Sequence, residues 1–274
     1  MKGSARLLLL LFVLAGCELD LRETVLHPSA EQRTRESLLM TPPRSVTVGD
    51  SYNFAVFADL HIGKPAGSYL AEFQQAVDSL NITFFCIAGD ITEHGLRTEY
   101  DSAKVVLSRI APFYTTIGNH DLYRADAWEN FKTTFGPATY SVTLADRLKL
   151  IFFDTAEGRI GQPQFDWLER ELADTTKIKI LISHFPLYDD QTPGIFRLAS
   201  TTERAKLQNL LQRYRVYAYC AGHIHGWRQI EISGVYHFTT GTISRALDFG
   251  KPGFLLFRVY PDTIIWQFIT FHSS

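Results

Sequence analysis

The sequence predicts an α/β fold in which strands and helices alternate along most of the chain. Short apolar runs typical of buried strands are separated by amphipathic stretches of helical period, which is the pattern of βα units with a largely parallel sheet. Of the 274 residues, 46% are apolar and 20% are charged, an ordinary composition for a globular protein that buries a full core. Folds of this class often reach about 250 residues without splitting, so we expect one folded domain.

The first seventeen residues differ in character from the rest of the chain. Lys2 and Arg6 precede an apolar run that ends in Leu-Ala-Gly-Cys17, as in a secretory leader. The run is shorter than the roughly 20 apolar residues that a membrane-spanning helix needs. Its end resembles the signal-peptidase site of bacterial lipoproteins, where the cysteine becomes the acylated first residue. We expect a lipoprotein signal peptide at residues 1–16 and a membrane anchor on lipidated Cys17, with cleavage without lipidation as the alternative.

Residues 17–51 are mixed and polar, with adjacent prolines and no sustained period, so we expect a tether between the lipid and the domain. The catalytic domain is expected at residues 52–274, on the periplasmic or surface face of the bacterial cell envelope. Cys86 and Cys220 each lie in an apolar, strand-like run. We interpret both as small buried hydrophobic residues, with a disulfide between them as the less favoured alternative.

The elements of the domain follow from the apolar runs and their flanking residues. Strands are expected at residues 53–58, 83–88, 113–117, 149–153, 178–183 and 216–221. Helices are expected between them, at residues 69–80, 98–110, 125–135, 164–173 and 201–214. The second helix has Thr98 as its expected cap, because a threonine hydroxyl can accept from the first backbone N–H groups.

The end of the domain changes character, because strand-like runs follow one another there without helices between them. We expect these strands at residues 228–232, 235–239, 254–260 and 263–269. Ser233-Gly234 and Pro261-Asp262 supply the short turns of two hairpins.

Side chains that can bind metals follow five of the expected strands, at the point where each strand ends. The five clusters are Asp59-Leu60-His61, Gly89-Asp90, Gly118-Asn119-His120-Asp121, His184, and Gly222-His223-Ile224-His225. In open α/β sheets the ligand crevice lies outside the carboxyl ends of the strands, so the fold would bring the clusters together. Successive clusters in the first half are about thirty residues apart, which is the length of one βαβ step.

Each cluster alone is a weak signal, since a Gly-Asp after a strand is usually a turn and a single loop histidine is usually a surface residue. Their joint occurrence is more informative. Five of the nine histidines fall in these clusters, beside glycines that let the backbone turn sharply and approach a ligand. We therefore interpret the clusters as one site.

With these five motifs complete and in order, the chain resembles the calcineurin-like metallophosphoesterases from about residue 53 to its end. The resemblance implies a four-layer α-β-β-α sandwich, with two mixed β-sheets flanked by helices and two metal ions at one edge. By motif position, seven side chains would bind the metals. Those for the first ion are Asp59, His61 and His225. Those for the second ion are Asn119, His184 and His223, and Asp90 would bridge both.

Imidazole, carboxylate and amide oxygen form a donor set suited to Mn, Fe or Zn, whereas the lack of cysteine argues against a structural zinc site. Two ions about 3.5–4 Å apart can acidify a bridging water and stabilise the charge that develops during in-line attack on phosphorus. The activity implied is dinuclear-metal-dependent hydrolysis of phosphodiesters, phosphomonoesters or both, by attack of a metal-bridging hydroxide.

Two residues of the third cluster are expected to act without binding metal. The family places His120 toward the leaving group as a proton donor, a role typically worth about 10²- to 10⁴-fold in rate, and Asp121 would orient its ring. A structural role for His120 and a turn or capping role for Asp121 remain open. His94, Arg124 and Tyr188 are weaker candidates for substrate contact, because loop residues of this kind are usually only solvated.

Two other classes of function remain open. The first is a non-catalytic envelope binding module that keeps the fold, although such members usually lose ligands that this chain retains. The second is a nuclease, which the net charge of -2 disfavours, so we expect a small phosphate ester rather than nucleic acid as partner. Export away from the cytosol argues against turnover of signalling cyclic nucleotides. Residues 185–200 are the segment expected to set specificity.

Overall fold

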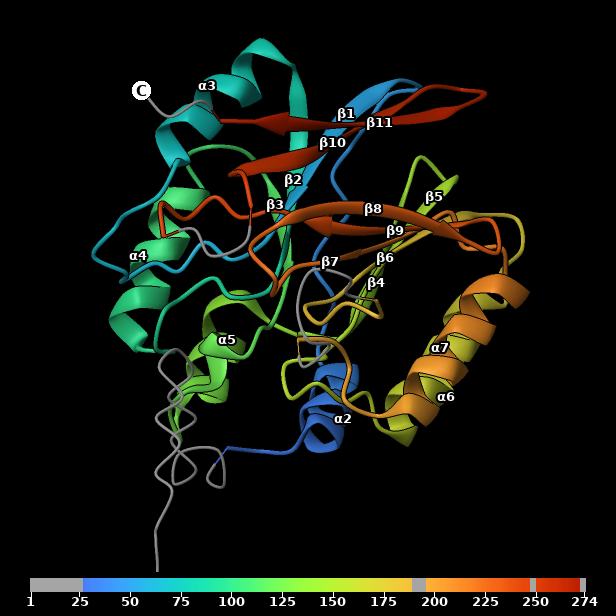
Figure 1. The fold of residues 1–274 in the computed structure, drawn as a ribbon, viewed down its shortest axis with the longest axis horizontal. Coiled ribbons are helices and arrows are strands. Elements are labelled where there is room, and N and C mark those ends of the chain that lie inside the picture. Colours follow the sequence, from blue (N-terminus) through green and yellow to red (C-terminus); the bar gives the residue numbers. More distant parts are fainter. Residues whose placement is uncertain (1–26, 189–195, 247–249, 272–274) are drawn as a thin grey trace, which may run out of the picture.

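The computed structural model describes residues 27–188, 196–246 and 250–271, so Cys17 and the expected leader lie outside the described residues. Two mixed β-sheets pack face to face, and helices cover their outer faces (Figure 1). This arrangement confirms the predicted α/β sandwich. None of the helices within these ranges combines the length and the apolar character that crossing a bilayer requires.

The first sheet has the strand order β11-β10-β1-β2-β3. Its strands are β1 (Tyr52–Phe57), β2 (Ile82–Ala88), β3 (Phe113–Thr116), β10 (Gly253–Val259) and β11 (Ile264–Thr270). The first three are parallel to one another, whereas β10 pairs antiparallel with both β1 and β11. The carboxyl ends of β1, β2 and β3 therefore open onto the same edge.

The second sheet has the order β4-β5-β6-β7-β9-β8. Its strands are β4 (Tyr140–Leu144), β5 (Leu148–Phe152), β6 (Ile178–Ile182), β7 (Ala218–Ala221), β8 (Trp227–Ile232) and β9 (Val235–Thr240). β5, β6, β7 and β9 are parallel, and antiparallel strands β4 and β8 form the two edges. β4 is not among the strands expected from the sequence.

Helices α3 (Leu70–Ser79), α4 (Arg97–Leu107) and α5 (Ala127–Phe135) lie on the side of the first sheet, and α6 (Gln162–Leu172) and α7 (Thr201–Arg213) lie on the side of the second (Figure 1). The expected cap of α4 is wrong, because this helix begins at Arg97 and Thr98 lies inside its first turn. The Glu99 carboxylate instead accepts from the backbone N–H of Leu96, at 3.2 Å.

The layer between the sheets is an extensive apolar core, and aromatic rings fill much of it. Phe54 of β1 stacks on Phe84 of β2 and on Phe257 of β10, with ring centroids 5.1 and 4.8 Å apart. Cys86 and Cys220 lie in the same layer as free, buried thiols, as the sequence predicted. The packed layer holds the two sheets in a fixed relation, and so it also fixes the loops at their edge.

Part of the segment expected to be a tether is folded onto the domain. Helix α2 (Ala30–Leu39) begins after Ser29, whose hydroxyl accepts from the backbone N–H of Gln32 at 3.3 Å. Its buried face is mostly polar, and the Arg33 guanidinium is fully buried with Nε 2.7 Å from Asp154 Oδ2. The structure thus differs from the expected tether at residues 30–39, because specific polar partners hold this helix in place of apolar packing.

Candidate metal centre

The five motif loops follow β1, β2, β3, β6 and β7 and gather their side chains at one edge of the sandwich. All seven side chains implied as metal ligands lie in two adjoining groups. One group contains Asp59, His61, Asp90 and His225, and the other contains Asp90, His184 and His223. Within each group the potential ligand atoms lie within 4.8 Å of one another. Asn119 joins the second group, with Oδ1 2.9 Å from His184 Nε2.

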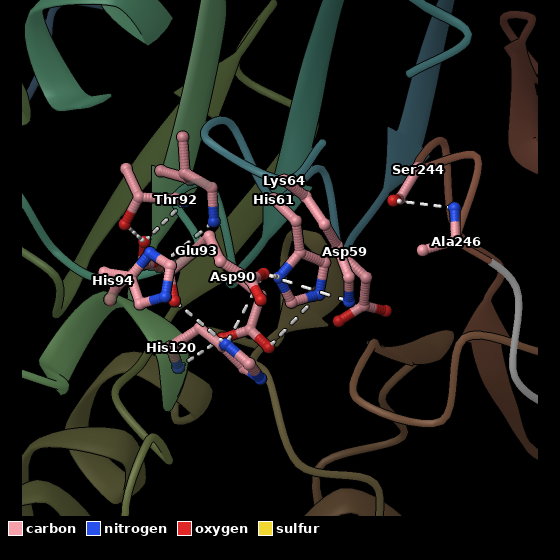
Figure 2. Close-up of polar contacts among 12 residues, drawn as sticks. Asp59, His61, Lys64, Asp90, Thr92, Glu93, His94, His120, Ser244 and Ala246 are labelled. Carbon is pink, nitrogen blue, oxygen red and sulfur yellow. Dashed lines mark hydrogen bonds and ion pairs between the residues drawn. The ribbon is translucent and has the colours of Figure 1, made fainter. Parts of the chain in front are cut away.

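Asp90 is therefore the one residue common to both groups, as a bridging carboxylate would be. Figure 2 shows Asp90 between His61 and His120, with Asp59 on the far side of His61. Asp90 Oδ2 lies 3.3 Å from His184 Nε2 and 3.8 Å from His61 Nε2. The structure brings the expected residues together, and their binding of metal stays a prediction.

The backbone at these loops has an uncommon conformation. Five of the clustered residues have φ between 53° and 72°, in the left-handed region that residues other than glycine seldom adopt: Asp59, His61, Asp90, His223 and His225. Such conformations cost about 1–3 kcal/mol each and concentrate at functional sites, where the surrounding structure enforces them. The surrounding structure therefore holds the backbone of these turns in a conformation that their residues do not favour on their own.

The motif glycines leave room for the ligands. A Cβ on Gly118 would overlap the Asp90 carboxylate, although the backbone of Gly118 is not left-handed. A Cβ on Gly89 would lie 2.7 Å from His184 Nδ1, which is closer than real contacts allow. These positions need glycine because another strand end approaches them closely.

The electrostatics of the cluster favour a bound cation. Asp59 and Asp90 are almost completely buried, and the ion-pair partners that the described residues offer them are all histidines. Burial raises the pKa of Asp59. Burial opposes ionisation of Asp90 as well, but the His184 and His120 imidazoles hold the pKa of Asp90 well below its usual range. Buried carboxylates of this kind need a compensating positive charge, commonly a metal.

The surroundings of His184 also favour positive charge, here on its own ring. Burial disfavours its charged form, yet the attraction of Asp90 raises the pKa of His184 to about 9. Its Nδ1 lies 2.9 Å from the Ala88 carbonyl oxygen. When Nδ1–H donates to that oxygen, the lone pair of Nε2 is free to face a metal, which is the usual way a ligand histidine is oriented.

His61 and His225 fit the first metal in a similar way. Their Nε2 atoms lie 3.1 Å apart, so two unprotonated nitrogens would repel unless a proton or a cation lay with them. His61 Nδ1 lies 2.8 Å from Glu93 Oε2, which lets Nδ1–H face that carboxylate and leaves Nε2 as the ligand atom. The donor set of imidazole, carboxylate and amide oxygen accordingly fits two divalent ions of the Mn, Fe or Zn type.

His120 lies beside this cluster and is one-fifth exposed, with its ring 4.5 Å from the His61 ring. Its Nδ1 lies 3.1 Å from the Glu93 carbonyl oxygen and 3.7 Å from Glu93 Oε2. The expectation that Asp121 orients this ring is therefore corrected. Asp121 is fully buried, and its carboxylate accepts from Thr92 Oγ1 and from the backbone N–H groups of residues 91, 92 and 118.

Asp121 instead ties together two of the motif loops. Its partners span the loop after β2 and Gly118 of the loop after β3, so the carboxylate fixes the relative positions of these loops. Burial raises the pKa of Asp121 to about 6. Glu93 is not among the residues expected from the sequence, although its place three residues after Asp90 is a usable signal.

The weaker candidates lie in different surroundings. His94 is half exposed and contacts Glu99, with Nδ1 3.2 Å from Oε1. Arg124 is exposed, with Nε 3.8 Å from Asp126. Tyr188 packs its ring edge-on against His237, at 5.2 Å between centroids. A further aromatic residue, Phe185, stacks on the His223 ring at 3.8 Å and so borders the site.

Comparisons with known proteins agree with this geometry. A family model described as calcineurin-like phosphoesterase matches residues 52–227. Similar solved structures include the purple acid phosphatase PPD1 of yellow lupin, Lupinus luteus, with a TM-score of 0.66, 17% identity, and coverage of 84% of this chain and 53% of that chain.

Two further solved structures share the fold over nearly their whole length. GAP50, the anchor in the inner membrane complex of Plasmodium, has a TM-score of 0.63 and 18% identity, with coverage of 81% of this chain and 85% of that chain. A dimetal phosphatase from Danio rerio has a TM-score of 0.62 and 13% identity, with coverage of 80% and 96%. At these identities the likeness shows the fold alone.

Proposed function

Because this chain belongs to the calcineurin-like phosphoesterase family, we propose that it is a hydrolase of small-molecule phosphate esters that works with two divalent metal ions. The observation that carries the proposal is the position of Asp90, which is shared by two groups of metal-capable donors. A single carboxylate common to both groups is what a pair of closely spaced ions requires. Phosphodiesters and phosphomonoesters are both within this class.

The residues of this chain have separate tasks in the proposal. Asp59, His61 and His225 would hold one ion, Asn119, His184 and His223 would hold the other, and Asp90 would be available to both. When bound, such a pair of ions supplies an acidified water and positive charge for the phosphoryl oxygens. His120, which is partly exposed beside the cluster, donates a proton to the departing oxygen.

Glu93 sets the proton on the His120 ring. With Nδ1–H donated to the Glu93 backbone carbonyl oxygen, 3.1 Å away, the ring keeps Nε2 for the proton that moves to the leaving group. Partial exposure of His120 allows this proton to be replaced from solvent between turnovers.

The test of reaction class uses the purified chain from residue 27 onward with Mn, Fe or Zn added. Hydrolysis of an aryl phosphomonoester is compared with that of an aryl phosphodiester. We expect turnover of at least one ester that depends on the added metal. If neither ester is cleaved and the protein holds clearly less than one ion per chain, the non-catalytic binding module becomes the better interpretation.

Two substitutions separate chemistry from metal binding. Asp90→Ala is expected to lose metal and turnover together, because it removes the carboxylate common to both ions. His120→Ala is expected to keep both ions and to lose about 10²- to 10⁴-fold in turnover. Metal content by elemental analysis and rates on an ester with a poor leaving group provide the measurement. Near-normal rates of the His120 variant on that ester would contradict its role as an acid.

We also propose that the protein acts at the bacterial cell envelope as a lipid-anchored protein. The support is the basic and apolar leader pattern that ends in Cys17. The full chain is expected to fractionate with membranes and to yield an acylated N-terminal peptide by mass spectrometry, whereas Cys17→Ala is released. Recovery of the unaltered chain in the soluble fraction would contradict the anchor but not the hydrolase.

A further inference from the structure

A pocket of about 210 Å³ lies on the outer face of the second sheet, beside the segment that follows β6. Its floor is formed by neighbouring strands, because His237 of β9 pairs with Tyr219 of β7 on one side and with Ile230 of β8 on the other. Directly paired residues point to the same face of a sheet. Phe238, the next residue in β9, packs in the layer between the sheets.

Two polar side chains in this pocket are buried without partners. His237 is 6% exposed and neither of its ring nitrogens has a hydrogen-bond partner among the described residues. Thr239 is 5% exposed and its hydroxyl also has none there. Since each unpartnered buried group costs about 1–3 kcal/mol, each needs an explanation, and two that line one pocket are explained by a ligand that pairs with them. Both lie on one face of β9 and line the same pocket.

The other groups that face His237 define the charge of the pocket. Arg197 and Arg228 line it, none of its described lining residues is acidic, and Arg197 Nε is likewise buried without a partner. Within the part of the chain that the structure describes, the other titratable groups in ring contact with His237 are Tyr188 and Tyr219. Burial lowers the pKa of His237 to about 4, so near neutral pH its ring offers one donor and one acceptor.

The walls of the pocket suit a flat ring. The Tyr188 and Tyr219 rings lie 5.2 and 5.9 Å from the His237 ring, and Leu187 and Ile224 add apolar surface. A cavity of about 150 Å³ is large enough to hold benzene. The volume here therefore admits a single ring with small polar substituents.

We propose that this pocket binds one heteroaromatic ring of the pyrimidine-base type, whose edge supplies the hydrogen-bond partners that His237 and Thr239 lack. Such a ring can be a free base or the organic group of a phosphate ester. The second source rests on the proposed function. Two residues that line the pocket are close in sequence to metal-ligand candidates, which is consistent with this source: Ile224 lies between His223 and His225, and Pro186 is two residues after His184.

The test measures uracil binding to the metal-loaded protein by calorimetry and by the NMR signals of the His237 ring. We expect saturable binding that shifts these signals. Thr239→Val keeps the side-chain shape and is expected to weaken binding about tenfold, without lowering the melting temperature. Thr240→Val is the matched control, since the Thr240 hydroxyl is also buried without a partner but does not line the pocket. Absence of uracil binding, or equal binding by both variants, would overturn the proposal.

A second arm distinguishes the two sources of the ring. A non-hydrolysable uridine phosphonate that competes both with uracil and with inorganic phosphate identifies the ring as part of the substrate. Competition with only one of the two identifies the pocket as a site for a free base. Uracil binding by a chain that shows no ester hydrolysis would support the pocket while contradicting the proposed hydrolase, so the two failures remain distinguishable.

Discussion

Glu93 connects a metal-ligand candidate to the proposed proton donor. Its Oε2 lies 2.8 Å from His61 Nδ1 and 3.7 Å from His120 Nδ1. The neighbouring imidazoles hold the pKa of Glu93 below its usual value, although burial opposes this. An ionised Glu93 therefore places a negative charge beside His61 Nδ1 and near the His120 ring, whose Nδ1 faces the Glu93 backbone carbonyl oxygen at 3.1 Å.

Glu93→Gln is expected to lower turnover about 10- to 100-fold, because the amide keeps the shape of the side chain but removes the negative charge that faces His61 and lies near His120. The pH dependence of turnover should change as well, which a purely structural role would not produce. Glu129→Gln is the control, since Glu129 is exposed and contacts only Lys132 among the described charges. Unchanged rates and pH profile in the Glu93 variant would contradict the positioning role.

Gly118 is expected to tolerate no side chain. Gly118→Ala places a methyl group where the Asp90 carboxylate lies, so either the carboxylate or the loop must move. We expect loss of metal binding, measured by elemental analysis, together with a lower melting temperature. Gly49→Ala is the control, because nothing lies within 4 Å of its added methyl group. A Gly118 variant that retains two ions per chain would show that the loop adapts.

At the scale of elements, helix α2 joins the N-terminal segment to the loop before α6. Arg33 pairs with Asp154 through Nε and Nη2, at 2.7 and 3.1 Å, and its Nη1 lies 2.8 Å from Glu157 Oε1. The next residue, Thr155, accepts through its hydroxyl from the backbone N–H of His184, at 3.1 Å. The docking of α2 thus supports a loop that contacts the second metal group.

Arg33→Met should destabilise the fold by about 3–5 kcal/mol, because it leaves buried Asp154 without its cation. Urea unfolding of the chain from residue 27 onward measures this change. Arg35→Ala, which removes only an exposed pair with Glu31, should change stability by less than about 0.5 kcal/mol. Equal effects of the two substitutions would mean that α2 contributes little to the folded domain.

Helix α2 and strand β4 were not predicted from the sequence, and each has a physical reason. Helix α2 buries Arg33, Thr34 and Ser37, so its buried face carries no apolar period, and only the Ser29 cap marked it. Strand β4 is a five-residue edge strand whose inward residues alternate with Ser141 and Thr143. Its signal is short and half polar, and its pairing with β5 comes from the turn that joins them.

At the scale of the whole molecule, the proposed ions would join loops that belong to different sheets. Asp59, Asp90 and Asn119 follow strands of the first sheet, and His184, His223 and His225 follow strands of the second. Without a cation, buried carboxylates and imidazoles remain close to one another at this junction. Metal binding should therefore stabilise the sandwich as well as the site.

We expect saturating Mn²⁺ to raise the melting temperature, with a gain of about 2.7 kcal/mol when the free ion is a hundredfold above its Kd. Removal of the ion with a chelator should reverse the shift. Asp90→Ala should abolish it, whereas His94→Ala should leave it intact, because His94 contacts Glu99 outside the ligand groups. A wild-type melting temperature that does not respond to Mn²⁺, Fe²⁺ or Zn²⁺ would contradict the metal centre.

The sequence by itself determined most strands and helices of the domain and the identity of the clustered residues, because buried strands and turn glycines leave local patterns. Only the tertiary structure decided that Glu93 rather than Asp121 contacts the His120 ring, that α2 docks through a buried arginine, and that His237 and Thr239 share a pocket. Contacts of this kind join residues far apart in the chain, and their direction depends on how two sheets pack, which no local period encodes.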